Sequence, residues 1–294
     1  MKWKRVFKIL GWIFLSLFIV GLGVIFYFTK YGIPEMMSKT EAEQEKIIVE
    51  ATGLQPQFHS YQVEDRTMRY IELGDTSKPL VLMLHGSPGT KDNYVRYLTD
   101  STLNSNFYLI AVDRPGFQGS GAGIAEPSLK KQAACIKPII EKFQHQKVIL
   151  VGHSLGGPVI ARMAMDYGEL LDGLVIVAGS LAPELEPKEW YRPYFKALSF
   201  MFADMLVSSN LEIMAHKAEL TKMLPLWKNI TTPTIVIQGT KDDLVHPNNA
   251  NFAKGKMINA DVRLEMVEDG DHFILWSRRD LVKAAIFELL EKEK

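Results

Sequence analysis

The chain has 294 residues, of which 47% are hydrophobic and 23% are charged, a balance that is ordinary for a globular protein with a real core. Its 34 lysines and arginines equal its 34 aspartates and glutamates, so no excess of positive charge points to a nucleic-acid partner. The one cysteine, Cys135, excludes an internal disulfide and any zinc site built from cysteines.

The N-terminal segment, residues 1–30, differs from the rest of the chain. Residues 9–28 form a run of 20 residues without charge, and as a helix this run spans roughly 30 Å, the thickness of the hydrocarbon core of a bilayer. Four basic residues precede it, namely Lys2, Lys4, Arg5 and Lys8. The positive-inside rule therefore predicts a single-pass anchor with a cytoplasmic N-terminus and an extracytoplasmic domain. The alternative is a cleaved signal peptide and a secreted protein, but no small-residue cleavage site follows the run.

The next segment, residues 31–56, is predicted to be a stalk or linker between the anchor and a domain over residues 57–294. An acidic helix over residues 34–52, ending at Gly53, accounts for most of this linker. The domain opens with two alternating runs, residues 58–65 and 66–75, which predict an antiparallel hairpin.

Beyond the hairpin the pattern changes to short, mostly continuous apolar runs, which are typical of strands buried on both faces of a parallel sheet. These runs are residues 79–86, 107–113, 148–152, 174–179, 234–239 and 262–269. Helical stretches alternate with them at residues 128–146, 156–168, 247–257 and 278–293. The alternation predicts an α/β architecture, with a doubly wound, mostly parallel and twisted sheet that is flanked by helices.

One connection, about residues 181–230, is too long to be a bare loop inside a compact domain. It is rich in aromatic residues and methionine. We predict that it forms a helical lid, inserted over one end of the sheet. Most of its aromatic and methionine side chains are expected to pack within the lid itself.

The segment KVILVGHSLGGPVIARMA, residues 147–164, leaves a buried strand through a glycine-rich turn and at once enters a helix. Such a turn lifts its central side chain, Ser154, off the edge of the sheet, and it needs small neighbours, here Gly152 and Gly156. The helix that follows directs its free N–H groups and its positive dipole end toward the same point, which favours a developing oxyanion. Ser154 is therefore a candidate nucleophile.

A serine nucleophile needs a base and an acid, and candidates for both follow late strands. His272 comes after the last predicted strand, and Asp242 comes after the strand before it. Asp243 is a competitor for the acid role. The carboxyl ends of the strands in an open α/β sheet meet at one edge, so we expect these side chains to lie near Ser154.

Together these motifs resemble the α/β-hydrolase superfamily over residues 57–294. GHSLGG matches its nucleophile elbow, GTKDDLVHP its acid loop, and HGSPG, residues 85–89, its oxyanion loop. The resemblance implies the α/β-hydrolase fold and a triad of Ser154, Asp242 and His272, and it favours Asp242 over Asp243.

The resemblance also implies an oxyanion hole formed by the backbone N–H groups of Ser87 and Leu155. The loop DRPGFQGS, residues 113–120, is similar to another loop of the superfamily, but Gln118 stands where a glycine is usual. Relatives that act as epoxide hydrolases or haloalkane dehalogenases carry an aspartate nucleophile, so Ser154 argues against both activities.

The sequence thus predicts a membrane-anchored serine hydrolase that cleaves a small-molecule ester through an acyl-enzyme and needs neither cofactor nor metal. Its expected partners are that ester, with an apolar acyl or alcohol group suggested by the lid, and the bilayer around residues 9–28; no nucleic acid is expected. Aminopeptidases, carbon–carbon hydrolases and haloperoxidases of the superfamily use the same triad and remain open. A non-catalytic binding protein that keeps the fold is the alternative from another class.

Overall fold

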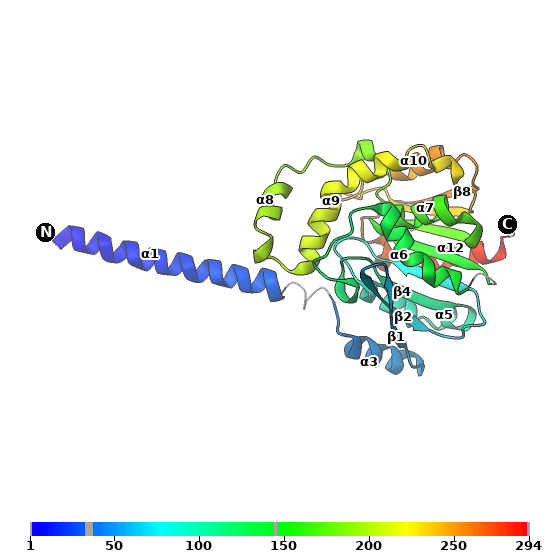
Figure 1. The fold of residues 1–294 in the computed structure, drawn as a ribbon, viewed down its shortest axis with the longest axis horizontal. Coiled ribbons are helices and arrows are strands. Elements are labelled where there is room, and N and C mark those ends of the chain that lie inside the picture. Colours follow the sequence, from blue (N-terminus) through cyan, green and yellow to red (C-terminus); the bar gives the residue numbers. More distant parts are fainter. Residues whose placement is uncertain (1, 33–37, 144–145, 293–294) are drawn as a thin grey trace.

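The computed structural model describes residues 2–32, 38–143 and 146–292. A long N-terminal helix projects from a rounded α/β domain (Figure 1). The positions 34–37, 144–145 and 293, which belong to predicted helices, lie outside the described residues.

The centre of the domain, within the described residues, is an eight-stranded sheet in the order β1-β2-β4-β3-β5-β6-β7-β8. The strands are β1 Gln57–Val63, β2 Arg66–Leu73, β3 Leu80–Leu84, β4 Tyr108–Asp113, β5 Val148–His153, β6 Gly173–Val177, β7 Thr234–Gly239 and β8 Val262–Val267. The pairs β1–β2 and β2–β4 are antiparallel, and the remaining neighbours are parallel. The predicted hairpin and the predicted parallel strands are therefore confirmed.

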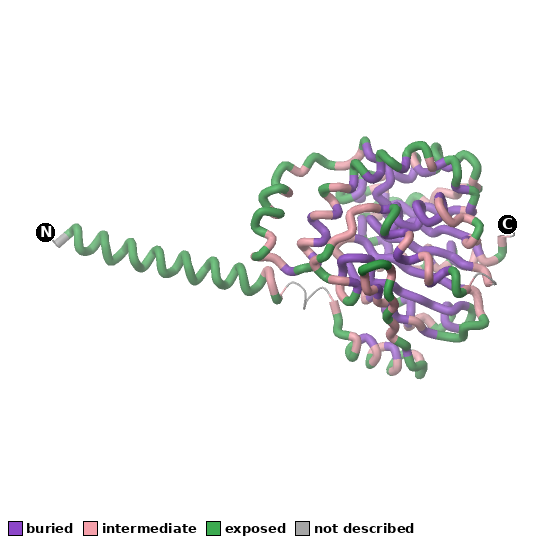
Figure 2. Tube along the Cα trace, in the orientation of Figure 1, coloured by how far each residue is buried: buried purple, intermediate pink, exposed green. Residues whose placement is uncertain are grey.

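Helices cover both faces of this sheet, because the strands alternate their buried side chains between two apolar clusters. One cluster includes Leu82 and the helices α6 (Leu129–Glu141), α7 (Gly156–Tyr167) and α10 (Asn248–Lys256). The other includes Val81 and Met83 and takes its helical side chains from α4 (Val95–Leu98), α5 (Ser101–Asn106), α11 (Ile274–Ser277) and α12 (Arg279–Glu291). Figure 2 shows the buried residues concentrated along the sheet between these layers.

Helix α3 (Glu41–Thr52) packs on the domain, although the sequence analysis treated residues 31–56 as a linker. Thr40 accepts a hydrogen bond from the backbone N–H of Glu43, and Gly53 ends the helix with a φ of +70°. Ile48 is fully buried in the same cluster as α4 and α12. The amphipathic pattern of α3 is weak, which explains why this docking was not apparent from the sequence.

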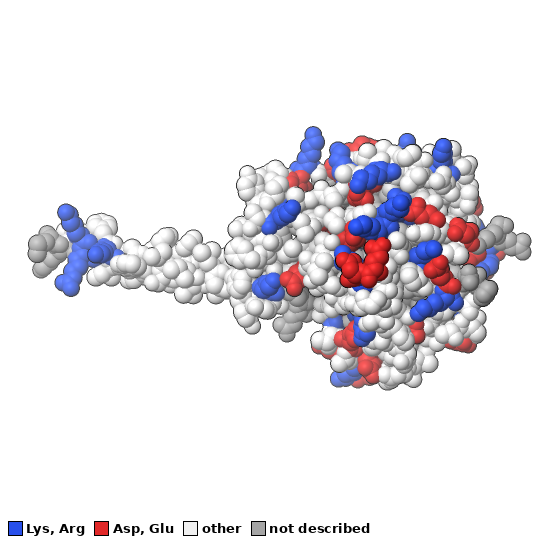
Figure 3. Space-filling view, viewed as in Figure 1, with Lys and Arg blue, Asp and Glu red and all other residues white. Residues whose placement is uncertain are grey.

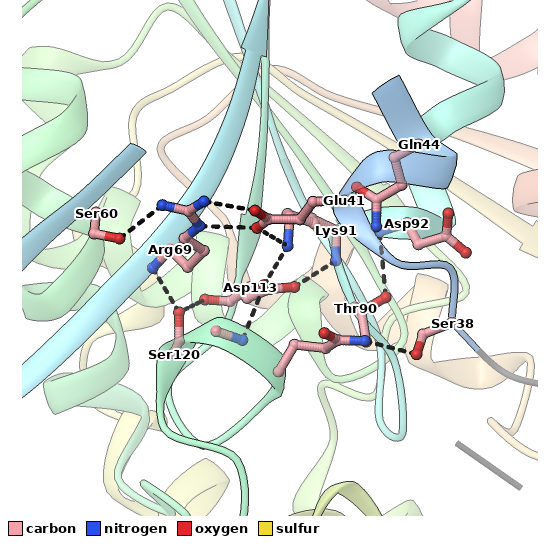
Figure 4. A network of polar contacts seen from close by, with 12 residues as sticks. Ser38, Glu41, Gln44, Ser60, Arg69, Thr90, Lys91, Asp92, Asp113 and Ser120 are labelled. Atoms are coloured by element: carbon pink, nitrogen blue, oxygen red, sulfur yellow. Dashed lines mark hydrogen bonds and ion pairs between the residues drawn. The ribbon is translucent and has the colours of Figure 1, made fainter. Parts of the chain in front are cut away.

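An ionic network fastens the first turn of α3 to the sheet (Figure 4). Arg69 donates two hydrogen bonds to the Glu41 carboxylate, at 2.8 and 2.6 Å. The Lys91 ammonium lies 3.2 Å from Glu41 and donates to Asp113 at 2.8 Å, with Lys91 almost fully buried. A buried lysine is tolerated only when its charge is paired. This network therefore joins the start of α3 to the carboxyl end of strand β4.

The predicted insertion is helical, and its largest elements are α8 (Arg192–Ala197) and α9 (Asp204–Met223). Short turns of 3-10 helix at Pro183–Leu185, Ser199–Met201 and Trp227–Asn229 complete it. Phe195 and Phe202 stack with ring centroids 3.9 Å apart, as expected for side chains that pack within the lid. Four aromatic side chains of the lid are nevertheless exposed to solvent, namely Trp190, Tyr191, Tyr194 and Phe200, although the Trp190 ring contacts those of Tyr191 and Tyr194.

The N-terminal helix α1 (Lys2–Tyr27) continues as a π-helix over Phe28–Gly32. Among the described residues, one helical stretch, Trp3–Gly32, is long and apolar enough to cross a membrane, and its apolar window has a mean hydropathy of 2.6 and no buried residue. Its end contacts the lid, because Thr29 Oγ1 donates to the carbonyl of Met201 at 2.9 Å and Lys30 pairs with Asp204 at 3.0 Å. The lid, rather than the sheet, thus receives the end of this helix.

Candidate active site

The turn between β5 and α7 holds Ser154 in a strained backbone conformation, with a φ of +52°. A side chain at Gly152 would place its Cβ 2.5 Å from the carbonyl oxygen of Gly156, and one at Gly156 would collide with the carbonyl of Leu84. Both obstacles are backbone atoms, which cannot turn aside as a side chain can. The small neighbours expected from the sequence are therefore a steric requirement of this turn.

Asp242 and His272 meet beyond the ends of β7 and β8. His272 Nδ1 lies 2.9 Å from Asp242 Oδ2, and the other oxygen of Asp242 accepts from the backbone N–H groups of Leu244 at 2.9 Å and Val245 at 2.8 Å. Burial opposes the ionisation of Asp242, but the hydrogen bond with His272 and these backbone bonds outweigh it and lower the pKa of the carboxyl group. An ionised Asp242 accepts a hydrogen bond from Nδ1–H of the imidazole, which leaves Nε2 without a proton and free to act as a base.

The neighbouring Asp243 is exposed, whereas Asp242 is buried. No hydrogen bond or ion pair between Asp243 and His272 occurs among the described residues. The geometry therefore pairs His272 with Asp242, the carboxylate that the resemblance favours.

Ser154 and His272 both line a cavity of about 390 Å³ beneath the lid. Within the described part of the chain, no hydrogen bond joins Ser154 Oγ to His272. Hydrogen bonds between a nucleophile and its base are often long without substrate and shorten in the substrate complex. The structure thus brings the acid and the base into contact and places the serine in the same cavity.

The two residues expected to stabilise an oxyanion, Ser87 and Leu155, also line this cavity. Ser87 follows the end of β3, and Leu155 directly follows Ser154 at the start of α7. Each of the five sequence-predicted site residues, Ser87, Ser154, Leu155, Asp242 and His272, therefore follows the carboxyl end of a parallel strand, where open α/β sheets place their sites.

Arg114 braces the loop that contains Ser87, and the sequence analysis did not single it out. Its backbone N–H donates to His85 Nε2 at 2.9 Å, and its guanidinium donates to the carbonyls of His85 at 2.8 Å and Gly86 at 2.9 Å. Because His85 Nε2 accepts, its Nδ1 carries the proton and donates to the carbonyl of Gly86 at 2.7 Å. Burial, together with the charge of Arg114, holds the pKa of His85 well below its ordinary value, so the His85 imidazole stays neutral.

The same arginine ties the lid to the site. The guanidinium of Arg114 donates to both carboxylate oxygens of Glu212 on α9, and Gln132 bridges the pair from α6. Arg114 and Glu212 are both buried, so their charges depend on each other. The loop 113–120 could be recognised from the sequence by its family pattern. The partner of its arginine could not, because Glu212 lies 98 residues away.

Gln118, the departure from the family pattern in this loop, adopts a φ of +41°. This value lies in the region that a glycine would occupy without strain. Its side chain donates a hydrogen bond to Ser38 Oγ at 2.6 Å. The loop therefore keeps a glycine-like backbone, and its glutamine helps to hold the segment before α3.

Next to the candidate nucleophile, His153 is buried against His272 and Trp276, with ring centroids 4.8 and 5.0 Å away. Burial, reinforced by His272, lowers the pKa of His153 from 6.5 to about 3. Between these pH values the unfolded chain binds a proton that the folded chain excludes, so stability falls as the pH falls. At pH 5 this amounts to about 2 kcal/mol from His153.

We expect His153→Gln to flatten the dependence of the melting temperature on pH. Thermal unfolding of the detergent-solubilised chain at about pH 7.5 and about pH 5 measures this dependence. The variant also loses the contact with the His272 carbonyl, but that loss lowers the melting temperature equally at both pH values and cancels in their difference. His85 and His216 also have lowered pKa values and remain in the variant. An unchanged difference between the two melting temperatures would contradict the assignment.

The comparisons with known proteins agree with this fold. Residues 79–213 match a family model described as alpha/beta hydrolase fold. Epoxide hydrolase 4 of Mus musculus is 24% identical over 80% of this chain and 80% of its own length, and monoacylglycerol lipase ABHD6 of Mus musculus is 25% identical over 70% and 62%.

Solved structures are similar in fold. A bacterial membrane phospholipase A superposes with a TM-score of 0.62 and 17% identity, covering 97% of this chain and 100% of that one. A hydrolase from Pseudomonas aeruginosa superposes with a TM-score of 0.62 and 17% identity, covering 80% and 99%.

Proposed function

The chain belongs to the α/β-hydrolase superfamily, and from that premise we propose that it is a membrane-anchored serine hydrolase that cleaves a carboxylic ester. One observation carries the proposal. Ser154 lies at a strained turn and lines the same cavity as His272, whose Nδ1 is held by a buried Asp242. This set contains a nucleophile, a base and an orienting acid.

In the proposed reaction, Ser154 Oγ attacks the acyl carbon of the ester while its proton passes to His272 Nε2. Asp242 stabilises the imidazolium, and the backbone N–H groups of Ser87 and Leu155 stabilise the oxyanion. His272 then gives the proton to the leaving alcohol as the C–O bond breaks, which leaves Ser154 acylated. Water, deprotonated by His272, releases the acid and restores the serine. No cofactor or metal takes part in these steps.

The cavity supports an ester with an apolar acyl or alcohol group. Its volume of about 390 Å³ falls within the range of small-molecule sites. Apolar side chains from the lid and from the acid loop supply much of its wall, namely Leu185, Pro187, Phe195, Leu206, Ile213, Leu244 and Val245. Charged groups, including Glu186 and Arg192, line another part and would orient a polar end of the substrate.

The epoxide hydrolase relatives raise epoxide opening as a second activity. A chain with that activity would be expected to carry an aspartate at the elbow, where this chain has Ser154. An ester is therefore the better-supported substrate. Amides and carbon–carbon bonds remain compatible with a serine nucleophile.

A substrate panel tests the proposal. We expect kcat/KM to rise with acyl chain length along a series of p-nitrophenyl esters, and a monoacylglycerol to be hydrolysed. An aminoacyl amide and an aryl epoxide should react at least about a hundredfold more slowly, because the site would lack contacts made for them. Faster opening of the epoxide, or faster cleavage of the amide, would overturn the assignment to esters.

The contacts of the N-terminal helix support an anchor that stays attached. We infer that residues 9–28 cross the bilayer, with the N-terminus in the cytoplasm and the domain, residues 57–294, on the opposite side. Cleavage of residues 1–30 as a signal peptide would remove Thr29 and Lys30, which bind the lid at Met201 and Asp204. The lid over residues 181–230 would thereby lose its contacts with the N-terminal helix.

A further inference from the structure

The outer side of the lid exposes four large apolar side chains, which we call the lid patch: Trp190, Tyr194, Leu198 and Phe200. Their exposed fractions are 79%, 66%, 46% and 68%. Single exposed apolar residues are common on soluble domains, but a group of them on one short segment marks an interaction surface.

The lid patch adjoins the end of the N-terminal helix through its last member, Phe200. Directly after Phe200, the segment 201–204 receives hydrogen bonds from Thr29 Oγ1 to the Met201 carbonyl at 2.9 Å and from Lys30 Nζ to the Phe202 carbonyl at 3.0 Å. Figure 1 shows α8 next to the point where α1 meets the domain. If residues 9–28 cross the bilayer, then Thr29 and this part of the lid lie at its surface.

The chemistry of this region suits the boundary between lipid headgroups and acyl chains. Tryptophan and tyrosine concentrate at that boundary because one part of each ring system is apolar and another is polar. Lys30, which pairs with Asp204, stands at the end of the apolar helix and places a polar ion pair there. Figure 3 shows mostly uncharged atoms where the helix joins the domain, and more charged side chains elsewhere on the visible face.

Helix α8 separates the lid patch from the cavity. Arg192 and Phe195, three residues apart, line the cavity, whereas Tyr194 and Leu198, four residues apart, are exposed. Residues three or four apart share a side of a helix, so α8 presents Arg192 and Phe195 to the cavity and Tyr194 outward, and Leu198, directly after the helix, is exposed as well. A displacement of α8 would therefore open the cavity toward whatever the lid patch touches.

From these observations we propose that the lid patch docks on the bilayer surface beside α1, and that an acyl chain reaches Ser154 from the membrane past α8. The docking stands on the exposed side chains and on their place beside the helix. The route of the acyl chain rests in addition on the proposed function.

Fluorescence of the full chain in phosphatidylcholine–phosphatidylglycerol nanodiscs tests the docking. An environment-sensitive dye is attached at Phe200→Cys, in a Cys135→Ala background that removes the natural thiol. The matched control is Ile258→Cys, because Ile258 is 70% exposed and follows α10, which lies on the side of the domain away from α1.

Lipids that carry a doxyl quencher should quench the dye at position 200 and leave the dye at position 258 bright. Equal brightness at both positions would overturn the docking. So would an environment change at position 200 that depends on protein concentration and not on doxyl lipid, because that result identifies a second copy of the chain as the occupant.

A kinetic comparison tests the route. The triple variant Tyr194→Ser, Leu198→Ser and Phe200→Ser removes part of the lid patch and no residue that lines the cavity. We expect turnover of a soluble acetyl ester to stay within about twofold, and turnover of a long-chain ester in vesicles to fall about tenfold, since lipid affinity follows buried apolar area.

An equal loss on both substrates, or no loss on either, would overturn the route. If the parent chain hydrolyses no ester at all, the proposed function fails, and the fluorescence experiment still decides the docking.

Discussion

Replacing Ser154 with alanine is expected to lower kcat for the preferred ester by about 10⁵-fold, because the reaction loses its nucleophile and keeps only the oxyanion hole and binding. The variant should fold, since alanine at this position meets the same backbone strain at a φ of +52° as serine does. Ser154→Gly should lose activity equally and melt at a higher temperature, because glycine adopts a positive φ without strain. Initial rates and thermal unfolding of the purified variants measure both effects.

Ser180 provides a matched control for that experiment. It lines the same cavity, its hydroxyl donates to Glu186, and it lies 3.2 Å from His216 Nε2. Ser180 thus has its own histidine and carboxylate neighbours, yet it has no place in the proposed reaction. Ser180→Ala should retain most of the turnover. Loss of activity in Ser180→Ala with retention in Ser154→Ala would show that the wrong serine has been assigned.

The substitution Asp242→Asn is expected to lower kcat by about 10⁴-fold while the fold is retained. Asparagine can still accept the backbone hydrogen bonds of Leu244 and Val245 through its oxygen. Its amide has no negative charge to stabilise the imidazolium, and its N–H₂ group would favour the tautomer of His272 in which Nδ1 accepts. His272 Nε2 would then carry a proton and could not remove one from Ser154.

The adjacent Asp243→Asn makes the comparison specific, since it changes the same charge on an exposed side chain. We expect its kcat to stay within about twofold of the parent, as for surface substitutions away from a site. Steady-state kinetics on one ester, with both variants measured side by side, decides between them. A larger loss for Asp243→Asn than for Asp242→Asn would reverse the assignment of the acid.

Much of the fold was predictable because periodicity in this chain is clear. Continuous apolar runs such as 148–152 are typical of central strands, and the alternation over 58–65 and 66–75 predicts a hairpin with one covered face. The short helices α4 and α5, between β3 and β4, were not predicted, since helices of four and six residues are too short to show a helical period.

The site was predictable where its residues lie in local motifs, and less so where they act across the fold. Ser154 and its glycine neighbours form one steric unit of five residues, which leaves a readable pattern. The pairing of Arg114 with Glu212 leaves no such pattern, because the two residues are 98 positions apart and meet only through the packing of the lid on the loop. The docking of α3 through Glu41 and Lys91 depends on long-range ion pairs in the same way.

The exposed side of the lid shows a further limit of sequence reasoning. Trp190 and Phe200 are residue types that usually lie in a hydrophobic core, and a soluble insertion would be expected to bury them. Both are exposed instead, and Phe200 directly precedes Met201, whose carbonyl accepts a hydrogen bond from the end of the apolar helix. In the docking proposed above, the bilayer is their partner, and no local pattern within residues 181–230 states that relation.

The most direct test of the account is to locate the covalent adduct left by a fluorophosphonate probe. Trypsin cleavage after Lys147 and Arg162 releases the peptide Val148–Arg162, in which Ser154 is the one hydroxyl-bearing residue. We expect peptide mass spectrometry to find a single adduct, on this peptide, and to find none after Ser154→Ala. An adduct on the peptide that contains Ser180, or no adduct on folded and purified chain, would contradict the claim that Ser154 is an activated nucleophile.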